Sequence, residues 1–381
     1  MEIIKFFFPE IYLSFTSLLI LLLLSFISLN PSSQFFLWLI NLFISFCLLV
    51  SNYNINYFIS SEYFIGDLAH YYLRLVIFFF GFLLYFSLKN ILFKESLINE
   101  FSLLFVLVLA FSSILLSSSN LLVAFVLIET ISLSLYLLVS FYKKNLLSLE
   151  AGLKYFLFGT MASLFLFLGI FFIYYSTSEF SLSKLLAISY EKNTLFYLGF
   201  LLIFIGIVFK LGGVPFHFWA PEVYQGAPTM VFPLLILISK FSFAVFLINL
   251  VYYLIKINTA YPLNLSFFQN FFYLISLLSM ILGNLLALKQ KEIKRLLTYS
   301  SIAHIGYLLS LFTLPWNSSN LQIFLGYLFI YTLTLLGVNI ILLIILQKNK
   351  NLVKIEIPSL ELYLKDKNIL LVLSFLIFIF S

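Results

Sequence analysis

Charged side chains are scarce in this chain of 381 residues. Only 9% of the residues are Asp, Glu, Lys or Arg, while 63% are hydrophobic and 20% are aromatic. A soluble domain carries about 25% charged and about 45–50% apolar residues, so this chain lacks the polar side chains to cover a water-soluble globule. About 20 residues cross one hydrocarbon core. The composition therefore indicates an integral membrane protein and excludes a water-soluble enzyme.

Cysteine and histidine are almost absent as well. Cys47 is the single cysteine, which excludes a disulfide framework and a cysteine-ligated metal or iron–sulfur site within the chain. The three histidines, His70, His217 and His304, lie too far apart in sequence to form a local metal motif. A Gly-rich phosphate loop, a catalytic triad and a paired-carboxylate hydrolase signature are missing too. We therefore expect no cofactor-binding or metal site in this chain.

Apolar runs broken by short polar stretches predict twelve membrane-crossing segments, and hence an all-α polytopic transmembrane helix bundle. The seventh segment contains Gly212, Gly213 and Pro215, which weaken a helix and remove a backbone hydrogen bond. A packing kink would explain this pattern, but the charged Lys210 beside it favours a helix that is broken at membrane depth. The predicted segments are 11–29, 35–50, 72–88, 101–116, 121–142, 152–175, 195–222, 227–255, 271–288, 296–314, 321–346 and a run from 369 to the end.

The basic residues are distributed unevenly around these segments. Of the 21 Lys and Arg, thirteen lie in loops after odd-numbered segments and four lie on the opposite side. Basic loops face the electrically negative compartment, so this bias fits one alternating topology. The net charge of +6 is thereby explained without a nucleic-acid partner.

Four ionisable residues fall near the middle of their segments, namely Glu129, Lys210, Lys240 and His304. A central charge costs about 2.5–3.5 kcal/mol on insertion scales, and such residues usually face a bundle interior and mark an ion path. Burial favours the neutral form of a lysine, and a carboxylate within about 4–6 Å favours the charged form. A lysine can therefore load and release a proton, which an arginine cannot, and a histidine can pass one on. These residues predict a proton relay in which Glu129 lies within that range of Lys210.

Three further polar residues are candidates of lower weight. His217 and Lys154 each have a functional and a structural interpretation, and Glu222 has a structural one. His217 follows the helix break and either lines a proton path or caps freed carbonyls. Lys154, at the start of the sixth segment, either reaches to the membrane interface or feeds the relay. For Glu222 we expect a position at an interface or a helix end. The abundant Phe and Tyr are interpreted as lipid-facing and interhelical filler.

Five ordered blocks of the chain form a recognisable series: LIETISLSLYLL (127–138), EAGLKYFLFG (150–159), FKLGGVPFHFWAPEVYQGAPT (209–229), LISKF (237–241) and KEIKRLLTYSSIAHIGYLL (291–309). Together they resemble the antiporter-like membrane subunits of NADH:ubiquinone oxidoreductase (respiratory complex I), and among them the subunit 2 family. The related subunits 4 and 5 and the Mrp-type cation/proton antiporters typically carry a histidine-containing motif where this chain reads VYQGAP (223–228).

The resemblance implies a proton-translocating subunit in which Glu129 and Lys210 form the family's glutamate–lysine pair, with Lys240 and His304 continuing the central hydrophilic axis. It also implies that FMN, the iron–sulfur clusters and ubiquinone lie elsewhere in the complex. Other membrane-arm subunits and lipids are the expected partners. Because Phe, Tyr, Asn and Ser are abundant and Gly and Pro scarce, as in AT-rich organellar genomes, the expected location is the mitochondrial inner membrane. Two alternatives remain: a subunit of a cation/proton antiporter, and a non-pumping structural scaffold.

The family has inverted five-helix repeats, each with a broken helix and its own lysine. We expect three N-terminal helices in 1–100, a first repeat in 101–255 and an incomplete second repeat in 256–381. A weak repeat offset of 171 residues places the counterpart of Lys210 at Ser381, so the second broken helix would lie beyond the sequence given. Either the chain is truncated or the gene is split, and we expect a separate polypeptide that completes the fold.

Overall fold

The computed structural model describes residues 2–27, 29–52, 59–93, 95, 97–186, 194–260, 265–314 and 318–348. Eleven helices in these ranges are long and apolar enough to cross a membrane, and they correspond to the first eleven predicted segments. The twelfth predicted segment, from 369 to the end, lies outside the described residues, as do the expected second break and the contacts of Ser381. The eleven helices are α2 (Phe8–Phe26), α3 (Pro31–Ser51), α4 (Leu68–Ser87), α6 (Ile98–Leu116), α7 (Leu121–Val139), α8 (Leu146–Thr177), α10 (Thr194–Leu211), α12 (Ser239–Ala260), α13 (Leu265–Ala287), α14 (Ile293–Ser310) and α15 (Ser318–Lys348).

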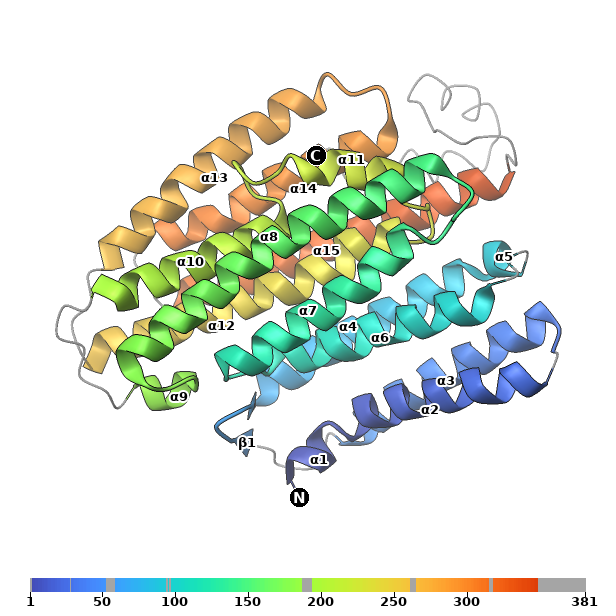
Figure 1. Cartoon of the computed structure of the whole chain (residues 1–381), viewed down its shortest axis with the longest axis horizontal. Coiled ribbons are helices and arrows are strands. Elements are labelled where there is room, and N and C mark those ends of the chain that lie inside the picture. Colours follow the sequence, from blue (N-terminus) through green and yellow to red (C-terminus); the bar gives the residue numbers. More distant parts are fainter. Residues whose placement is uncertain are drawn as a thin grey trace.

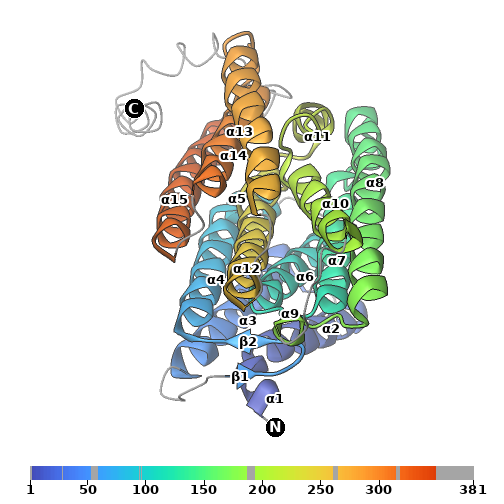
Figure 2. The ribbon, with the colours of Figure 1, turned by 90° about the vertical axis from the view of Figure 1, so that its left-hand side faces the viewer.

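The long helices lie side by side in one bundle (Figures 1 and 2). Helices α2 and α3 lie at one side of the bundle and α13 at the opposite side, with α7, α10 and α12 between them. Helix α10 packs along α8, and α13 packs along α14. The predicted division into three N-terminal helices and two repeats is not tested by this arrangement and stays a prediction.

The short elements lie at the ends of the long helices. The small helices are α1 (Glu2–Phe6), α5 (Lys89–Leu92), α9 (Leu182–Leu185) and α11 (Trp219–Gly226), and two-residue strands β1 (Ile59–Ser60) and β2 (Ile65–Gly66) form an antiparallel hairpin. The hairpin is tied to the loop after α6, because the Ile65 amide donates to the Ser117 carbonyl at 2.8 Å.

Helix starts follow from local sequence. The side chain of Asn120 caps α7 by accepting from the amides of Leu122 and Val123, and Asn145 caps α8 in the same way through the amide of Leu147. Such caps satisfy amides that have no partner within their helix. The eighth segment departs from the expected regular helix, because it begins as a π-helix, η2 (Leu234–Ile238), and only then continues as α12.

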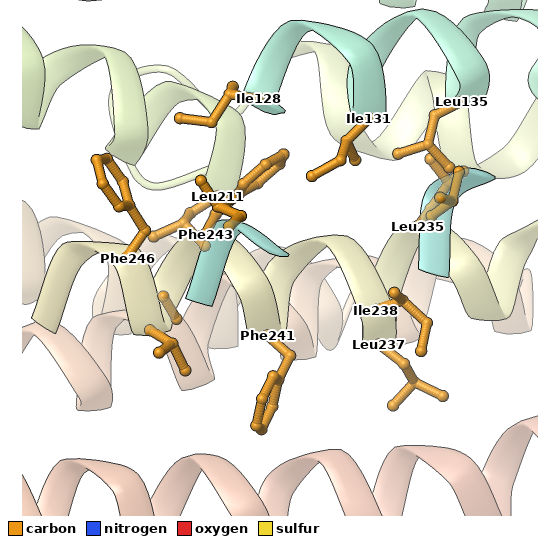
Figure 3. Close-up of a cluster of buried hydrophobic side chains, with 14 of the residues drawn as sticks. Ile128, Ile131, Leu135, Leu211, Leu235, Leu237, Ile238, Phe241, Phe243 and Phe246 are labelled. Carbon is orange, nitrogen blue, oxygen red and sulfur yellow. The ribbon is translucent and has the colours of Figure 1, made fainter. Parts of the chain in front are cut away.

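The centre of the bundle consists mainly of buried apolar side chains. Side chains of α7 meet side chains of η2 and α12, with Leu211 from the end of α10 among them (Figure 3). A buried polar group in such surroundings costs free energy unless it is hydrogen-bonded. The buried polar side chains of the interior therefore need hydrogen-bond partners, either other side chains or backbone groups. The labelled residues are Ile128, Ile131, Leu135, Leu211, Leu235, Leu237, Ile238, Phe241, Phe243 and Phe246.

Candidate functional site

The predicted helix break is present between α10 and α11. Gly212 has φ of 81°, a left-handed conformation that a residue without Cβ adopts at little cost. The chain satisfies its freed backbone groups internally: the Gly213 amide donates to the Val208 carbonyl at 2.9 Å, and the Val214 amide donates to the Ser279 hydroxyl at 3.0 Å. A break at this depth is tolerated where neighbouring helices supply such partners.

Lys210 lies in the last turn of α10, directly before the break, and pairs with Glu129 of α7. The Nζ–Oε1 distance is 3.2 Å, which confirms the expected contact. The lysine side chain is 4% exposed and the glutamate side chain 23%. The C-terminal end of a helix favours a cation, so the break adds to the stabilisation of the ammonium.

Two polar side chains of α7 complete the surroundings of Lys210. Its ammonium donates to the Ser132 hydroxyl at 2.8 Å and to the Tyr136 hydroxyl at 3.4 Å. Glu129, Ser132 and Tyr136 are spaced by three and four residues, so they share one face of the helix. The interpretation of the tyrosines as filler is therefore wrong for Tyr136.

Lys240 lies on α12 and is 3% exposed. Its ammonium donates to the Ser301 hydroxyl of α14 at 2.8 Å and lies 5.4 Å from the ring centre of Tyr224. The partners of Lys210 all lie on α7, whereas the partner of Lys240 lies on α14. The structure thus places these two predicted residues in separate polar clusters.

His304 lies on α14, one turn beyond Ser301. Its Nδ1 is 2.7 Å from the Tyr327 hydroxyl of α15, and the ring of Tyr331 lies against the imidazole with 4.5 Å between ring centres. Ser301, which accepts from Lys240, lies three residues before His304 and on the same face of α14, so the predicted lysine and histidine belong to one cluster. Tyr327 and Tyr331 are further tyrosines that are more than filler.

The auxiliary residues are placed as follows. The Pro215 backbone lies beside the buried His217 ring, and Nδ1 has no hydrogen-bond partner in the described parts of the chain. Lys154 bonds to Glu150 at 2.6 Å and to Glu222, in the first turn of α11, at 2.5 Å. All three side chains are at least one-third exposed. The ion pair of Lys154 and Glu222 joins α8 to the start of α11. Glu222 therefore lies at a helix end, as expected.

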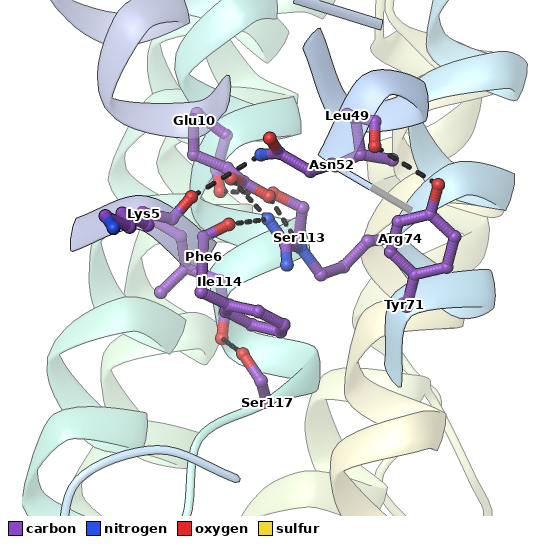
Figure 4. A network of polar contacts seen from close by, with 11 residues as sticks. Lys5, Phe6, Glu10, Leu49, Asn52, Tyr71, Arg74, Ser113, Ile114 and Ser117 are labelled. Atoms are coloured by element: carbon purple, nitrogen blue, oxygen red, sulfur yellow. Dashed lines mark hydrogen bonds and ion pairs between the residues drawn. The ribbon is translucent and has the colours of Figure 1, made fainter. Parts of the chain in front are cut away.

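Sequence reasoning missed a buried ion pair in the N-terminal helices. Arg74 of α4 donates through Nε to Glu10 Oε1 at 2.8 Å and through Nη2 to Glu10 Oε2 at 2.6 Å (Figure 4). Ser113 of α6 donates to the same carboxylate at 3.0 Å, and the Phe6 carbonyl accepts from Arg74 at 2.8 Å. Both charged residues are at most 1% exposed. The pair therefore joins α2, α4 and α6.

A second missed network joins α11 to α14. Gln225, in the VYQGAP stretch, donates to Glu292 at 2.5 Å and accepts from Arg295 at 2.7 Å. Lys294 donates to the Ala227 carbonyl at 2.7 Å. The polar residues that the sequence places in a basic loop thus hold the segment after the break in position.

Comparison with known proteins defines the class. Residues 118–381 match the family described as "NADH:quinone oxidoreductase/Mrp antiporter, TM". The chain belongs to this family of antiporter-like membrane proteins. The matched region contains Glu129, Lys210, Lys240 and His304.

Two curated relatives of the chain are subunits of NADH:quinone oxidoreductases. The chain is 38% identical over 312 residues to "NADH-quinone oxidoreductase subunit N 2" of Thermodesulfovibrio yellowstonii, covering 81% of this chain and 66% of the relative. It is 37% identical over 249 residues to "NADH-ubiquinone oxidoreductase chain 2" of Rhizopus oryzae, covering 65% of this chain and 46% of the relative. The chain thus spans between about half and two-thirds of the length of these two relatives.

Solved structures have the same fold. A chain of respiratory complex I from Thermus thermophilus with bound aureothin superposes with a TM-score of 0.70 at 28% identity, covering 89% of this chain and 70% of that one. A chain of an archaeal membrane-bound sulfane sulfur reductase gives a TM-score of 0.73 at 19% identity, covering 89% and 69%. The second likeness shows the fold alone.

Proposed function

We propose that the chain is a proton-translocating membrane-arm subunit of a respiratory NADH:quinone oxidoreductase. The names of the two relatives and the match to a complex I chain support this assignment. Other membrane-arm subunits would be its partners. FMN, the iron–sulfur clusters and ubiquinone would belong to other subunits, so this chain would move protons while electrons pass elsewhere.

The observation that carries the proposal is the contact between Glu129 and Lys210 at the end of a broken helix. The ammonium is held by one carboxylate, two hydroxyls and a helix C-terminus. Withdrawing the carboxylate would leave a desolvated cation, and the lysine would then release its proton. Moving one charge across a membrane costs about 2.3 kcal/mol per 100 mV, a scale that a shift in such a pair can supply.

The second cluster would take the proton further. Lys240 and His304 lie on α12 and α14, and Lys240 bonds to Ser301 of α14, whereas Lys210 bonds to side chains of α7. A lysine that exchanges its proton and a histidine beside it can form successive stations of a relay. We propose the order Glu129–Lys210, Lys240, His304, with His217 and Lys154 as auxiliary groups near the break.

The cation/proton antiporter remains a second candidate because the family description includes Mrp antiporters. The sequence favours the first candidate, because the stretch VYQGAP (223–228) contains no histidine where those antiporters typically carry a histidine-containing motif. Its Gln225 bonds instead to Glu292 and Arg295. An antiporter would exchange Na⁺ or K⁺ for protons, so vesicles with an imposed sodium gradient test this candidate directly. For location we propose the mitochondrial inner membrane, supported by the composition rich in Phe and Tyr.

Substitution of Lys210 tests the proposed function. Complexes carrying Lys210→Ala or Lys210→Arg would be reconstituted in vesicles, and acidification would be measured against NADH oxidation. Both variants should assemble and lose coupled pumping, because alanine carries no proton and arginine does not release one. Lys143→Ala, an exposed lysine in the loop after α7, is the matched control. Normal pumping by Lys210→Ala would favour the structural scaffold.

A further inference from the structure

A polar cavity lies at the end of the bundle where α4 begins, beside strand β2 (Figure 2). It is bordered by β2, the first turn of α4, the loop between α6 and α7, and the C-terminal half of α12. Its volume is about 240 Å³, whereas a single water needs about 10–15 Å³. The space therefore takes a group of many atoms. None of the described residues that line it belongs to the proposed relay.

The cavity lies at membrane-interface depth, on the electrically positive side. Asp67 is the N-cap of α4 and Lys256 lies near the end of α12, so both mark the ends of membrane-crossing helices. Both ends adjoin loops after even-numbered segments, opposite to the basic loops that face the negative compartment. Leu68, Tyr72 and Tyr252 are exposed close by, and tyrosines are enriched where a membrane meets water. The cavity therefore lies at the level of lipid headgroups, next to apolar surface for acyl chains.

One part of the cavity wall offers hydrogen-bond acceptors. Oδ1 of Asp67 accepts from the His70 amide at 2.9 Å and lies 2.6 Å from His70 Nδ1, which holds the carboxylate in place. The hydroxyls of Ser117 and Ser118 donate to backbone carbonyls, so their oxygens can accept. Asn249 donates through Nδ2 to a backbone carbonyl at 2.7 Å, which leaves its Oδ1 as an acceptor. A carboxylate surrounded by neutral acceptors suits an ammonium that has N–H groups to donate.

The α12 side of the cavity offers hydrogen-bond donors and a positive charge. Lys256 is exposed, and its Nζ lies 4.4 Å from the ring centre of Tyr252. The adjacent Tyr253 is 6% exposed, and its hydroxyl makes no hydrogen bond with the residues that the structure describes. A buried phenol usually has a hydrogen-bond partner, and this one lines the cavity. An ammonium and phenolic hydroxyls suit a phosphate group.

We propose that this cavity binds the headgroup of an ethanolamine phospholipid from the leaflet on the electrically positive side. The primary ammonium of the lipid pairs with Asp67 and donates to Asn249, and the phosphate accepts from Lys256 and Tyr253. The carboxylate and the ammonium of the cavity thus match the two charges of the zwitterion. A choline headgroup has no N–H to donate, and an anionic headgroup without an amine brings no positive charge to Asp67.

The experiment uses the assembled complex in phosphatidylcholine vesicles that contain a small fraction of a photoreactive lipid. Three probes with the same diazirine-bearing acyl chain carry an ethanolamine, a choline or a glycerol headgroup. After illumination, mass spectrometry measures the label on peptides that contain Tyr252 and Lys256, relative to the label on the exposed surface of α8. The ethanolamine probe should label these peptides severalfold more than the other two probes.

Substitution of Asp67 tests the contact with the ammonium. Asp67→Asn removes the charge but keeps a side chain that caps a helix. Labelling by the ethanolamine probe should fall severalfold, to the level of the choline probe. Glu62→Gln is the matched control, because it removes an exposed carboxylate of the same loop that pairs with Lys184 instead. This control should keep the preference for ethanolamine.

Several results would overturn the proposal. Equal labelling by the ethanolamine and choline probes in the unmodified complex would do so, even if Asp67→Asn fails to assemble. Stronger labelling by the glycerol probe would show that the charge of Lys256 alone selects the lipid. An unchanged preference for ethanolamine in Asp67→Asn would refute the contact with the ammonium. If soluble phosphoethanolamine displaced the probe completely, the ligand would be a free headgroup compound and the lipid assignment would be wrong.

Discussion

The hydroxyl of Tyr136 lies directly against Gly159, so a glycine on α8 decides how closely a phenol of α7 approaches the Lys210 ammonium. A Cβ at position 159 would overlap the phenol oxygen. The backbone of Gly159 does not have a positive φ, so its conformation does not require glycine. Close packing against Tyr136 requires it instead. The contact with Tyr136 explains why glycine stands at the end of the block EAGLKYFLFG, which the sequence alone does not reveal.

Gly159→Ala should displace the Tyr136 hydroxyl and weaken its contact with Lys210. Inserting a methyl group into a well-packed interior costs about 1–3 kcal/mol. We expect an assembled complex with a lower melting temperature and lower pumping per electron. Gly326→Ala is the matched control on α15, because no atom lies within 4 Å of its added Cβ. Equal pumping in both variants would show that the phenol is dispensable.

The pair of Glu10 and Arg74 predicts a large loss of stability. Glu10→Gln leaves a buried guanidinium without its counter-charge, and breaking a buried ion pair costs about 3–5 kcal/mol. The thermal stability of the assembled complex should fall markedly, while Glu10→Gln combined with Arg74→Met should recover part of the loss. Lys184→Gln breaks an exposed pair with Glu62 and should change the melting temperature little, because solvent screens such pairs. A Glu10→Gln variant as stable as this control would mean that Arg74 is stabilised by other contacts.

The contact between Lys154 and Glu222 predicts a charge-swap result. Lys154→Glu would bring three carboxylates together at the junction of α8 and α11 and weaken it, whereas adding Glu222→Lys should restore an opposite pair. Because the side chains are partly exposed to solvent, the change in melting temperature at each step should be small and should shrink at high salt. Melting curves of the single and double variants at two salt concentrations measure this. If the change in melting temperature of the double variant equals the sum of the changes of the two single variants, the two side chains do not interact.

Much of the site is predictable from composition and position. A charge in the middle of an apolar run is costly, so Glu129, Lys210, Lys240 and His304 stand out. Gly212 and Pro215 mark the helix break, because neither residue type suits the interior of a helix. The spacing of Ser132 and Tyr136 after Glu129 could also have been used, since three- and four-residue steps share a helix face.

Other parts depend on tertiary contacts that one sequence does not reveal. Glu10 and Arg74 are 64 residues apart, and hydropathy does not show which helices become neighbours. Tyr327 and Tyr331 are two of 24 tyrosines, most of which would fill space equally well. The π-helix at Leu234–Ile238 has no periodicity signal, because its five residues are uniformly apolar.

The most direct test of the central claim is the number of protons translocated per electron by the complex with Glu129→Gln. Glutamine preserves the size of the side chain and its hydrogen bond but removes the charge that holds Lys210 protonated. We predict that NADH oxidation continues while pumping per electron falls markedly, and that Glu100→Gln, an exposed carboxylate in the first turn of α6, retains the normal ratio. A Glu129→Gln complex with an unchanged ratio would contradict the account.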